Sequence, residues 1–289
     1  MKYRMIERCR DAFPIRMMCR HLNVSPSGFY DWCERPLSNR AKDNERLTER
    51  IKVHHAESDG VMGAPRIWRE LHYDGETASK NRVARLMQKA DIQGIPQRRQ
   101  WRKKRPEKRP VDVRNHLDRD FAAQQPNTKW ATDITYIRTA ENWLYLSIVL
   151  DLHSDVVVGW SMSHRQDRQL VIQAVLMALW QRKESTPVVL HSDRGCQFTS
   201  DEYQHFLKGH NLVCSMSAVG SAADNAAVEG FFGRLKRERV NRRQYRTRAE
   251  ARADIFDYIE RFHNPMKQRE LDGLNQGRST LPQPSVISG

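Results

Sequence analysis

The chain has 289 residues, 39% of them hydrophobic, which excludes a wholly disordered protein and is enough for one large domain or two to three smaller ones. Its formal net charge is +14, and residues 1–110 hold 26 Lys and Arg against 14 Asp and Glu, compared with 23 and 21 in residues 111–289. The longest apolar stretches are too short or interrupted to cross a bilayer, and charges at the N-terminus argue against a signal peptide, so we expect a soluble cytoplasmic protein with no membrane partner.

The uneven charge indicates a nucleic-acid anchor in the N-terminal third, because binding to a polyanion depends on phosphate neutralisation and counterion release. Residues 1–44 are expected to form an all-α region with a helix-turn-helix. Ser25 and Pro26 are typical of a helix start, as the N-cap and the first helical residue. This second helix of the pair would enter the DNA major groove, which predicts contacts by Ser27 and Tyr30. A plain three-helix bundle would have the same periodicity.

A second small helical DNA-binding region is expected over residues 45–95. Its last helix, at 80–89, has an apolar side formed by residues such as Val83. Arg82 and Arg85 are expected to be exposed on the opposite side, where they would contact DNA.

Residues 96–125 are expected to be a basic linker. Such a block cannot pack into a core, so it should stay solvated and become ordered on a phosphate backbone; a featureless tether is compatible with the same pattern. Between Pro96 and Pro110 its basic side chains are Arg98, Arg99, Arg102, Lys103, Lys104, Arg105, Lys108 and Arg109.

Residues 126–264 are expected to be an α/β core with C-terminal helices, followed by a flexible tail at 265–289. From residue 129 the pattern changes to alternating and β-branched runs, which are typical of strands. The order of three strands, helix, strand, helix, strand and helices predicts a mixed five-stranded sheet with flanking helices. The expected strands are 130–138, 144–152, 156–161, 188–191 and 212–216, and the expected helices between them are 169–182 and 200–208.

Three acidic residues of this core occupy unusual positions. Asp133 lies inside the first strand, where a carboxylate is costly unless its charge is compensated. Asp193 follows the fourth strand, and the ligands of open α/β sheets collect at strand ends. Glu229 lies on a helix whose packing side carries Phe231 and Leu235. Two neighbouring strands and a facing helix could therefore bring the three carboxylates together.

Each acid also has a simpler interpretation. Asp133 could pair with a buried Lys or Arg, Asp193 could be an Asx-turn residue, and Glu229 could pair with Lys236 on the helix surface. Together, on a basic protein, three converging carboxylates favour a divalent cation, because their charges cannot all persist in isolation. Oxygen ligands without nearby His or Cys select Mg²⁺ or Mn²⁺, and a pair of such ions promotes phosphodiester cleavage or joining.

Three local strings resemble a known family. They are WATDITY at 130–136, HSDRGCQF at 191–198 and DNAAVE at 224–229, with 59 residues between the two aspartates and 35 between the second aspartate and the glutamate. These strings resemble the three blocks of the retroviral-integrase-type catalytic core. From its first helices to about His263, the chain resembles the second-reading-frame product of bacterial transposable elements of the insertion-sequence-three family.

The resemblance implies a DDE transposase with a ribonuclease-H-like core. Asp133, Asp193 and Glu229 would be its catalytic residues and would hold two Mg²⁺ ions, with Mn²⁺ as an alternative. A water molecule would cleave at an element end, and the liberated 3′-hydroxyl would attack a second phosphodiester, without a covalent enzyme intermediate. Lys236 would contact element-end DNA. Asn225 would orient Glu229 or its loop, with helix capping as the competing role.

The resemblance also implies partners and a location. The protein would bind double-stranded DNA at the element ends and at the target, and it would act as a homo-oligomer together with an upstream reading-frame product, at the nucleoid of a bacterial cytoplasm. The chain departs from the family pattern at Gly230, where relatives have Ser or Thr. It also departs at 267–271, where an Arg-His pattern is expected.

Two other functions fit part of the sequence. A non-catalytic regulator that binds the element ends would explain the basic helical region, but it would not need three acids. A metal-dependent nuclease would use the same acids and cleave without joining, so strand-transfer products separate it from a transposase.

Neutralising the basic cluster from Arg98 to Arg109 should weaken DNA binding and flatten its salt dependence, because each lost phosphate contact removes counterion release. Binding titrations between about 50 and 200 mM salt would measure this slope. An unchanged slope would show that the segment is only a tether.

Overall fold

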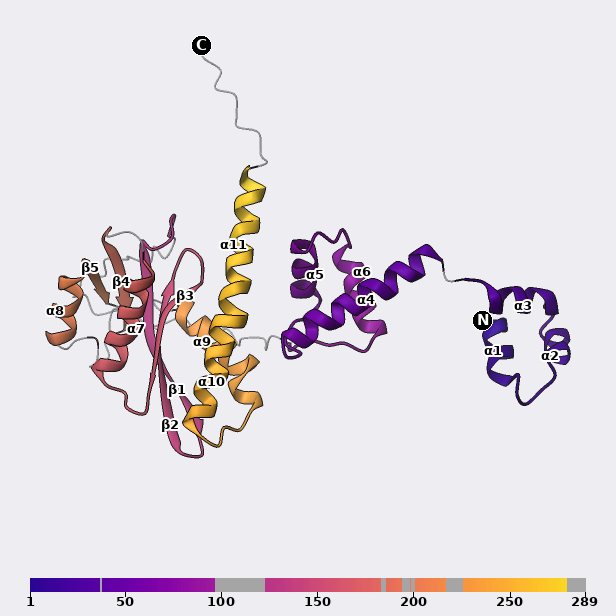
Figure 1. Ribbon diagram of the computed structural model, residues 1–289, viewed down its shortest axis with the longest axis horizontal. Helices are drawn as coiled ribbons and strands as arrows, with labels where there is room; N and C mark the ends of the chain where they lie inside the picture. The colour runs from indigo at the N-terminus through magenta and orange to yellow at the C-terminus, as the bar shows by residue number, and fades with distance from the viewer. Residues whose placement is uncertain are drawn as a thin grey trace, which may run out of the picture. The chain divides into compact units, whose positions relative to one another are not determined.

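The computed structural model of the chain describes residues 1–36, 38–96, 123–182, 186–193, 198, 201–216 and 226–279. These residues belong to two compact units, Met1–Gly94 and Ile95–Gly289, and each is described by itself (Figure 1). Across the described residues, every helix is too short or too polar to span a bilayer.

The first three helices pack around a small apolar centre formed by Ile6, Cys19 and Phe29. The last of them begins as its sequence predicts, because the Ser25 hydroxyl accepts the Gly28 N–H and Pro26 occupies the first turn. The helices are α1 (Lys2–Cys9), α2 (Ile15–His21) and α3 (Pro26–Glu34).

The next three helices bury one apolar side each, including Leu47, Ile67 and Val83. The first of these helices continues through the boundary expected after residue 44, so the structure places no break there. The expected second helical region is present, with bounds α4 (Asn39–Glu57), α5 (Ala64–Tyr73) and α6 (Lys80–Lys89).

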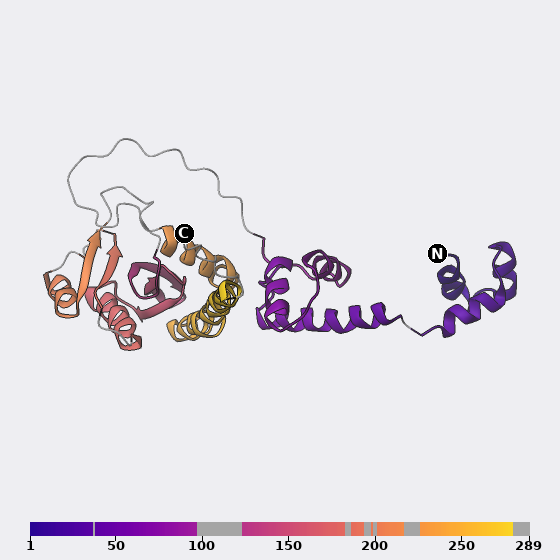
Figure 2. The ribbon, with the colours of Figure 1, turned by 90° about the horizontal axis from the view of Figure 1, so that it is seen from above.

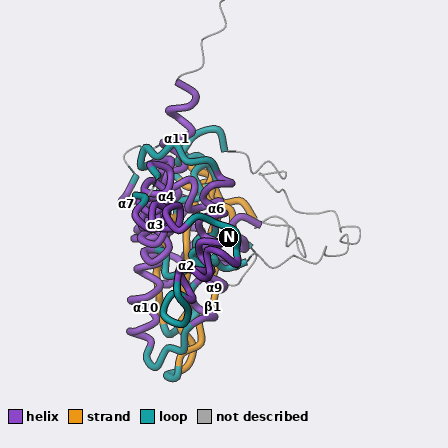
Figure 3. The backbone as a smooth tube through the Cα atoms, turned by 90° about the vertical axis from the view of Figure 1, so that its right-hand side faces the viewer, coloured by secondary structure: helices purple, strands orange, loops and turns teal. Residues whose placement is uncertain are grey.

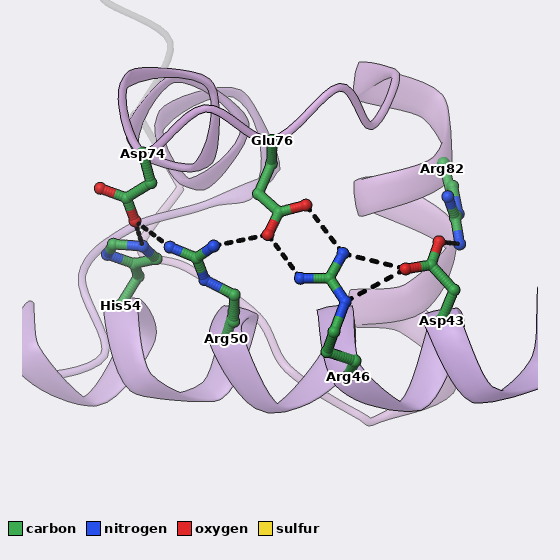
Figure 4. Close-up of polar contacts among 7 residues, drawn as sticks. All are labelled: Asp43, Arg46, Arg50, His54, Asp74, Glu76 and Arg82. Carbon is green, nitrogen blue, oxygen red and sulfur yellow. Dashed lines mark hydrogen bonds and ion pairs between the residues drawn. The ribbon is translucent and has the colours of Figure 1, made fainter.

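A chain of ion pairs ties α4 to the loop after α5 and to α6 (Figure 4). Arg46 lies 2.6 Å from Glu76, and this pairing together with Arg50 lowers the pKa of Glu76 to about 2. At the other end, Arg82 pairs with Asp43 at 2.7 Å. The network thus links three helices through side chains that are only partly exposed. Its members are Asp43, Arg46, Arg50, His54, Asp74, Glu76 and Arg82.

The second unit contains the expected mixed five-stranded sheet, in the order β3-β2-β1-β4-β5, with its strands drawn orange in Figure 3. The first three strands form an antiparallel meander, and β4 joins the other side of β1 in parallel. The bounds are β1 (Lys129–Thr139), β2 (Asn142–Asp151), β3 (Val157–Ser163), β4 (Val188–Ser192) and β5 (Leu212–Met216). All five lie within two residues of the predicted ends, because alternating or β-branched runs mark the strands.

Helices α7 (Arg168–Gln181) and α8 (Asp201–Gly209) pack against the sheet, α7 on β2 and β3 and α8 on β5 (Figure 2). The approach of α7 is so close that a Cβ at Gly159 would lie 2.2 Å from the Ala174 carbonyl oxygen. Only glycine fits at this position of β3. Trp130 and Val149 of the sheet join the apolar side chains of α7 in the main core.

The helices that follow β5 complete the unit. Two of them, α9 and α10, lie against β1. The flexible tail expected at 265–289 is wrong for residues 265–279, which are helical and include the buried Met266, and its remainder lies outside the described residues. The bounds of these helices are α9 (Ala226–Glu238), η2 (Val240–Arg242), α10 (Arg248–Phe256), η3 (Asp257–His263) and α11 (Asn264–Ser279).

The start of α11 is anchored to the outer edge of the sheet. The Asn264 amide accepts the Val157 N–H at 2.9 Å and donates to the Val157 carbonyl at 2.9 Å, as a neighbouring strand would. The His263 imidazole lies 2.9 Å from the Asp155 carbonyl through Nε2 and packs edge-on against Phe231. These contacts explain why the chain turns helical here despite its polar composition.

His263 should make the second unit less stable in acid. Burial, with Arg234 and Lys267 nearby, lowers the pKa of His263 to about 4, although the Asp155 carbonyl opposes this. The unfolded chain therefore takes up a proton more readily, so stability falls as the pH drops from about 6.5 towards 4. This shift in pKa corresponds to a change of roughly 3 kcal/mol in the free energy of unfolding.

Urea unfolding of the wild type and His263→Gln between these pH values would measure the effect. The glutamine variant should lose this part of the pH dependence, even if it is less stable at neutral pH. Parallel pH profiles for the two proteins would contradict the assignment.

Candidate active site

Asp133 lies near the middle of β1, beyond the point where β4 stops pairing with it. It is partly buried, and its carboxylate accepts the Ile134 N–H at 2.7 Å. The strand thus fixes the position of this carboxyl group, as its place in the sequence predicts.

Asp193 is the first residue after β4 and is exposed. The β1–β4 ladder pairs Lys129 with Val189 and Ala131 with His191. The same register, extended by two residues, leads from Asp133 to Asp193. Parallel pairing of short strands is therefore what brings these two aspartates towards each other.

Glu229 lies in the first turn of α9 and is exposed. The helix buries Phe231 and Leu235 and contacts β1. A Cβ at Gly230 would meet nothing within 4 Å, so the departure from the family pattern leaves open space beside the glutamate.

The electrostatics of Asp133 connect the three acids. The pKa of Asp133 is raised to about 7, mainly by burial and also by the charges of Asp193 and Glu229, while the Ile134 N–H and Lys236 oppose the shift. Asp193 and Glu229 therefore both lie within electrostatic range of Asp133. However, no three His, Cys, Asp or Glu side chains in the described part of the chain are gathered closely enough to hold a metal ion.

Lys236 lies beside the acids, two turns after Glu229. Its ammonium group is 4.8 Å from the centre of the Tyr136 ring. Burial lowers the pKa of Lys236, and the charge of Asp133 opposes this change. The lysine thus lies over an aromatic ring and within the electrostatic influence of a carboxyl group.

Sequence reasoning did not single out the aromatic side chains next to this lysine. Tyr136 and Trp143 contact each other edge to face, with ring centres 5.1 Å apart, and Arg138 lies 5.8 Å from the centre of the Trp143 ring. The sequence gives only a weak indication of this cluster: Tyr136 and Arg138 alternate on β1, and Trp143 follows the turn.

The predicted DNA-contact residues of the first unit differ in exposure. Ser27 and Arg85 are exposed, and Tyr30 is 50% exposed. The expected exposure of Arg82 is wrong, because its guanidinium pairs with Asp43 and donates to Asn44. Helical spacing alone could not reveal these partners on α4. DNA contact by each of these residues stays a prediction.

Several predicted site residues lie outside the described residues. They are Asn225 and, in the basic linker, Arg98, Arg99, Arg102, Lys103, Lys104 and Arg105.

Family models match most of the chain. They are described as an HTH-like domain at residues 42–100 and an integrase core domain at 123–222 and again at 229–276. The catalytic core domain of BIV integrase is a similar solved structure, at 19% identity and a TM-score of 0.38, covering 52% of this chain and 99% of that one.

Curated relatives match nearly the whole length. The Insertion element IS600 uncharacterized 31 kDa protein of Shigella sonnei is 34% identical over 89% of this chain and 94% of its own. Transposase InsF for insertion sequence IS3A of Escherichia coli is 41% identical over 283 residues, which cover 94% of this chain and 96% of the relative. On this evidence the chain belongs to the IS3 family of insertion-sequence transposases.

Proposed function

We propose that the chain catalyses DNA transposition by cleaving a phosphodiester at an insertion-sequence end and joining the liberated 3′-hydroxyl to target DNA. The observation that carries this proposal is the β1–β4 register, which leads from Asp133 to Asp193 on a strand that the helix of Glu229 also contacts; the charges of Asp193 and Glu229 both act on Asp133. Membership of a transposase family supports the same reaction class.

The three carboxyl groups fit a divalent cation in donor chemistry. They offer only oxygen ligands, and their mutual repulsion is the kind that a cation relieves. Asp193 and Glu229 are exposed, so their side chains can turn towards Asp133 when a cation is present. We infer that these residues hold two Mg²⁺ ions, or Mn²⁺. Such ions would supply activation of the attacking oxygen and stabilisation of the leaving one.

The remaining roles follow from where each side chain is held. Asp133 provides the fixed point, because the strand and the Ile134 N–H restrict its carboxylate. Lys236 presents a positive charge beside it, suited to a DNA phosphate next to the reacting bond. The reaction requires no nucleophilic side chain, since water and then a DNA hydroxyl attack.

DNA recognition is assigned to the helical first unit and the basic linker. The HTH-like match at residues 42–100 and the positive charge of residues 1–110 support this assignment. We extend the proposal to element ends and target DNA as partners, to a homo-oligomer and to an upstream reading-frame product.

Asp133→Asn, Asp193→Asn and Glu229→Gln should each reduce Mg²⁺-dependent cleavage of element-end DNA by at least roughly a thousandfold. DNA affinity without divalent metal should be retained or increase, because each change removes a negative charge. Gel assays would score both nicked and strand-transfer products, together with binding.

Glu202→Gln is the matched control, since Glu202 is a half-exposed acid of α8 paired with Arg168 at 2.7 Å. It should cleave like the wild type. Near-native cleavage by any one of the three acid variants would disprove its assignment, and nicks without joined products would indicate a nuclease.

Asp133→Asn should also alter the pH dependence of stability in metal-free protein. Because the pKa of Asp133 is about 7 rather than the usual 3.8, the folded chain holds this proton more tightly. The contribution of this bound proton to the free energy of unfolding is therefore complete below about pH 3.8 and is lost as the pH rises through 7. Its upper bound is about 4 kcal/mol. Asp193, Glu229 and Lys236 are the charged groups that face it.

Urea unfolding with chelator at pH 5 and pH 8 would compare the two proteins. Relative to the wild type, the asparagine variant should have a higher free energy of unfolding at pH 8 than at pH 5. Added Mg²⁺ should stabilise only the wild type at pH 8. A constant stability difference across this range would rule out the raised pKa.

A further inference from the structure

Four side chains form a continuous row from the acids along the β1–β2 hairpin. The Lys236 ammonium lies 4.8 Å from the Tyr136 ring centre, and the Tyr136 and Trp143 ring centres are 5.1 Å apart. The Arg138 guanidinium then lies 5.8 Å from the Trp143 ring centre. We call this row of Lys236, Tyr136, Trp143 and Arg138 the aromatic strip.

The hairpin register places three members of the strip on one face of the sheet. Arg138 is directly opposite Trp143, and Tyr136 is opposite Tyr145, so Tyr136 and Trp143 are diagonal neighbours. Tyr136 is 57% exposed and Trp143 is 36% exposed. Two adjoining aromatic rings are thus open to solvent on this surface of the sheet.

The strip is built on a fixed hairpin. Its tip is tied to the segment before α10, because the Ala140 N–H donates to the Tyr245 carbonyl at 2.9 Å. The Arg248 N–H also donates to the Glu141 carboxylate at 2.8 Å. The acid at the tip is thereby engaged elsewhere, and the side chains of the strip itself carry only positive charge.

The strip begins beside the candidate active site. Tyr136 is three residues beyond Asp133, roughly 10 Å along the strand, and side-chain alternation places the two on opposite faces of β1. Among the described residues, β1 is not paired with β4 beyond Ala131, and Lys236 connects the two faces here, since it lies over the Tyr136 ring and its charge acts on Asp133. A DNA strand whose reacting phosphodiester lies at the acids would therefore reach the strip by passing around this edge of β1.

The chemistry of the strip favours unpaired nucleotides. Aromatic rings stack on base faces, and alternating cations contact the phosphates between them. Base pairs inside a duplex keep their faces stacked on each other, so only bases released from pairing can occupy such rings. Two rings offer too little apolar area for a stable protein interface, which needs about 1,000 Å² or more.

We propose that the aromatic strip binds unpaired bases of the DNA strand that is cut or joined at Asp133, Asp193 and Glu229. This inference rests on the proposed function, because it takes DNA as the substrate at those acids. It assigns Tyr136 and Trp143 to base stacking and Arg138 to a phosphate contact.

The test uses the full chain carrying Glu229→Gln, so that binding is measured without cleavage. The probes are element-end duplexes that are blunt or carry three unpaired nucleotides at either the 3′ or the 5′ end, with 2-aminopurine among the unpaired bases. The parent protein should quench 2-aminopurine fluorescence on one of the extended duplexes. Tyr136→Leu or Trp143→Leu should abolish this quenching and weaken binding of that duplex roughly tenfold, given about 1–3 kcal/mol per stacked base.

Matched controls separate stacking from folding. Tyr136→Phe and Trp143→Phe retain a ring and should keep the quenching. Trp180→Leu removes another exposed tryptophan, 81% exposed near the end of α7, and should change nothing. The leucine variants should bind the blunt duplex within about twofold of the parent, whereas an equal loss on blunt and extended duplexes would overturn the proposal.

The outcome is separable from that of the proposed function. If wild-type protein cleaves and joins DNA while the leucine variants bind extended duplexes like the parent, the strip has no stacking role and the transposase assignment stands. If the quenching appears but wild-type protein neither cleaves nor joins, the strip binds unpaired DNA and the catalytic assignment fails.

Discussion

Three carboxyl groups repel one another at the point where β1 and β4 separate. No attraction among them holds this arrangement, so the fold must do so. Strand β1 fixes Asp133, the end of β4 delivers Asp193, and α9 carries Glu229 along β1. The repulsion makes the site dependent on a positive charge, which Lys236 supplies in part and a divalent cation would complete.

The helices after α9 keep that helix in place. Near its end, Glu238 accepts a hydrogen bond from the Tyr258 hydroxyl at 2.9 Å. The buried Arg239 pairs with Asp254 at 3.1 Å. Breaking one partner of such a pair leaves an uncompensated charge in the interior, which costs several kcal/mol. The C-terminal helices thus support the helix that carries Glu229, although they carry none of the three candidate acids.

Much of the core could be predicted from sequence, because strands with alternating side chains and acids at strand positions leave clear local patterns. Features that depend on distant partners could not. Arg82 looks exposed by helical spacing, yet Asp43 and Asn44 on another helix bind it. The helix α11 replaces an expected flexible tail because Asn264 and Met266 find their partners in tertiary contacts. The aromatic strip appears only once the hairpin register is known.

The ion-pair network on α4 limits how the basic first unit meets a polyanion. Arg46, Arg50 and Arg82 already face carboxylates of their own chain, so they displace few condensed ions from a nucleic acid. The number of arginines in this unit would therefore overestimate the number of DNA phosphates that it can neutralise. Its electrostatic footprint is set by side chains such as Lys80, Arg85 and Lys89, which α6 exposes outside that network.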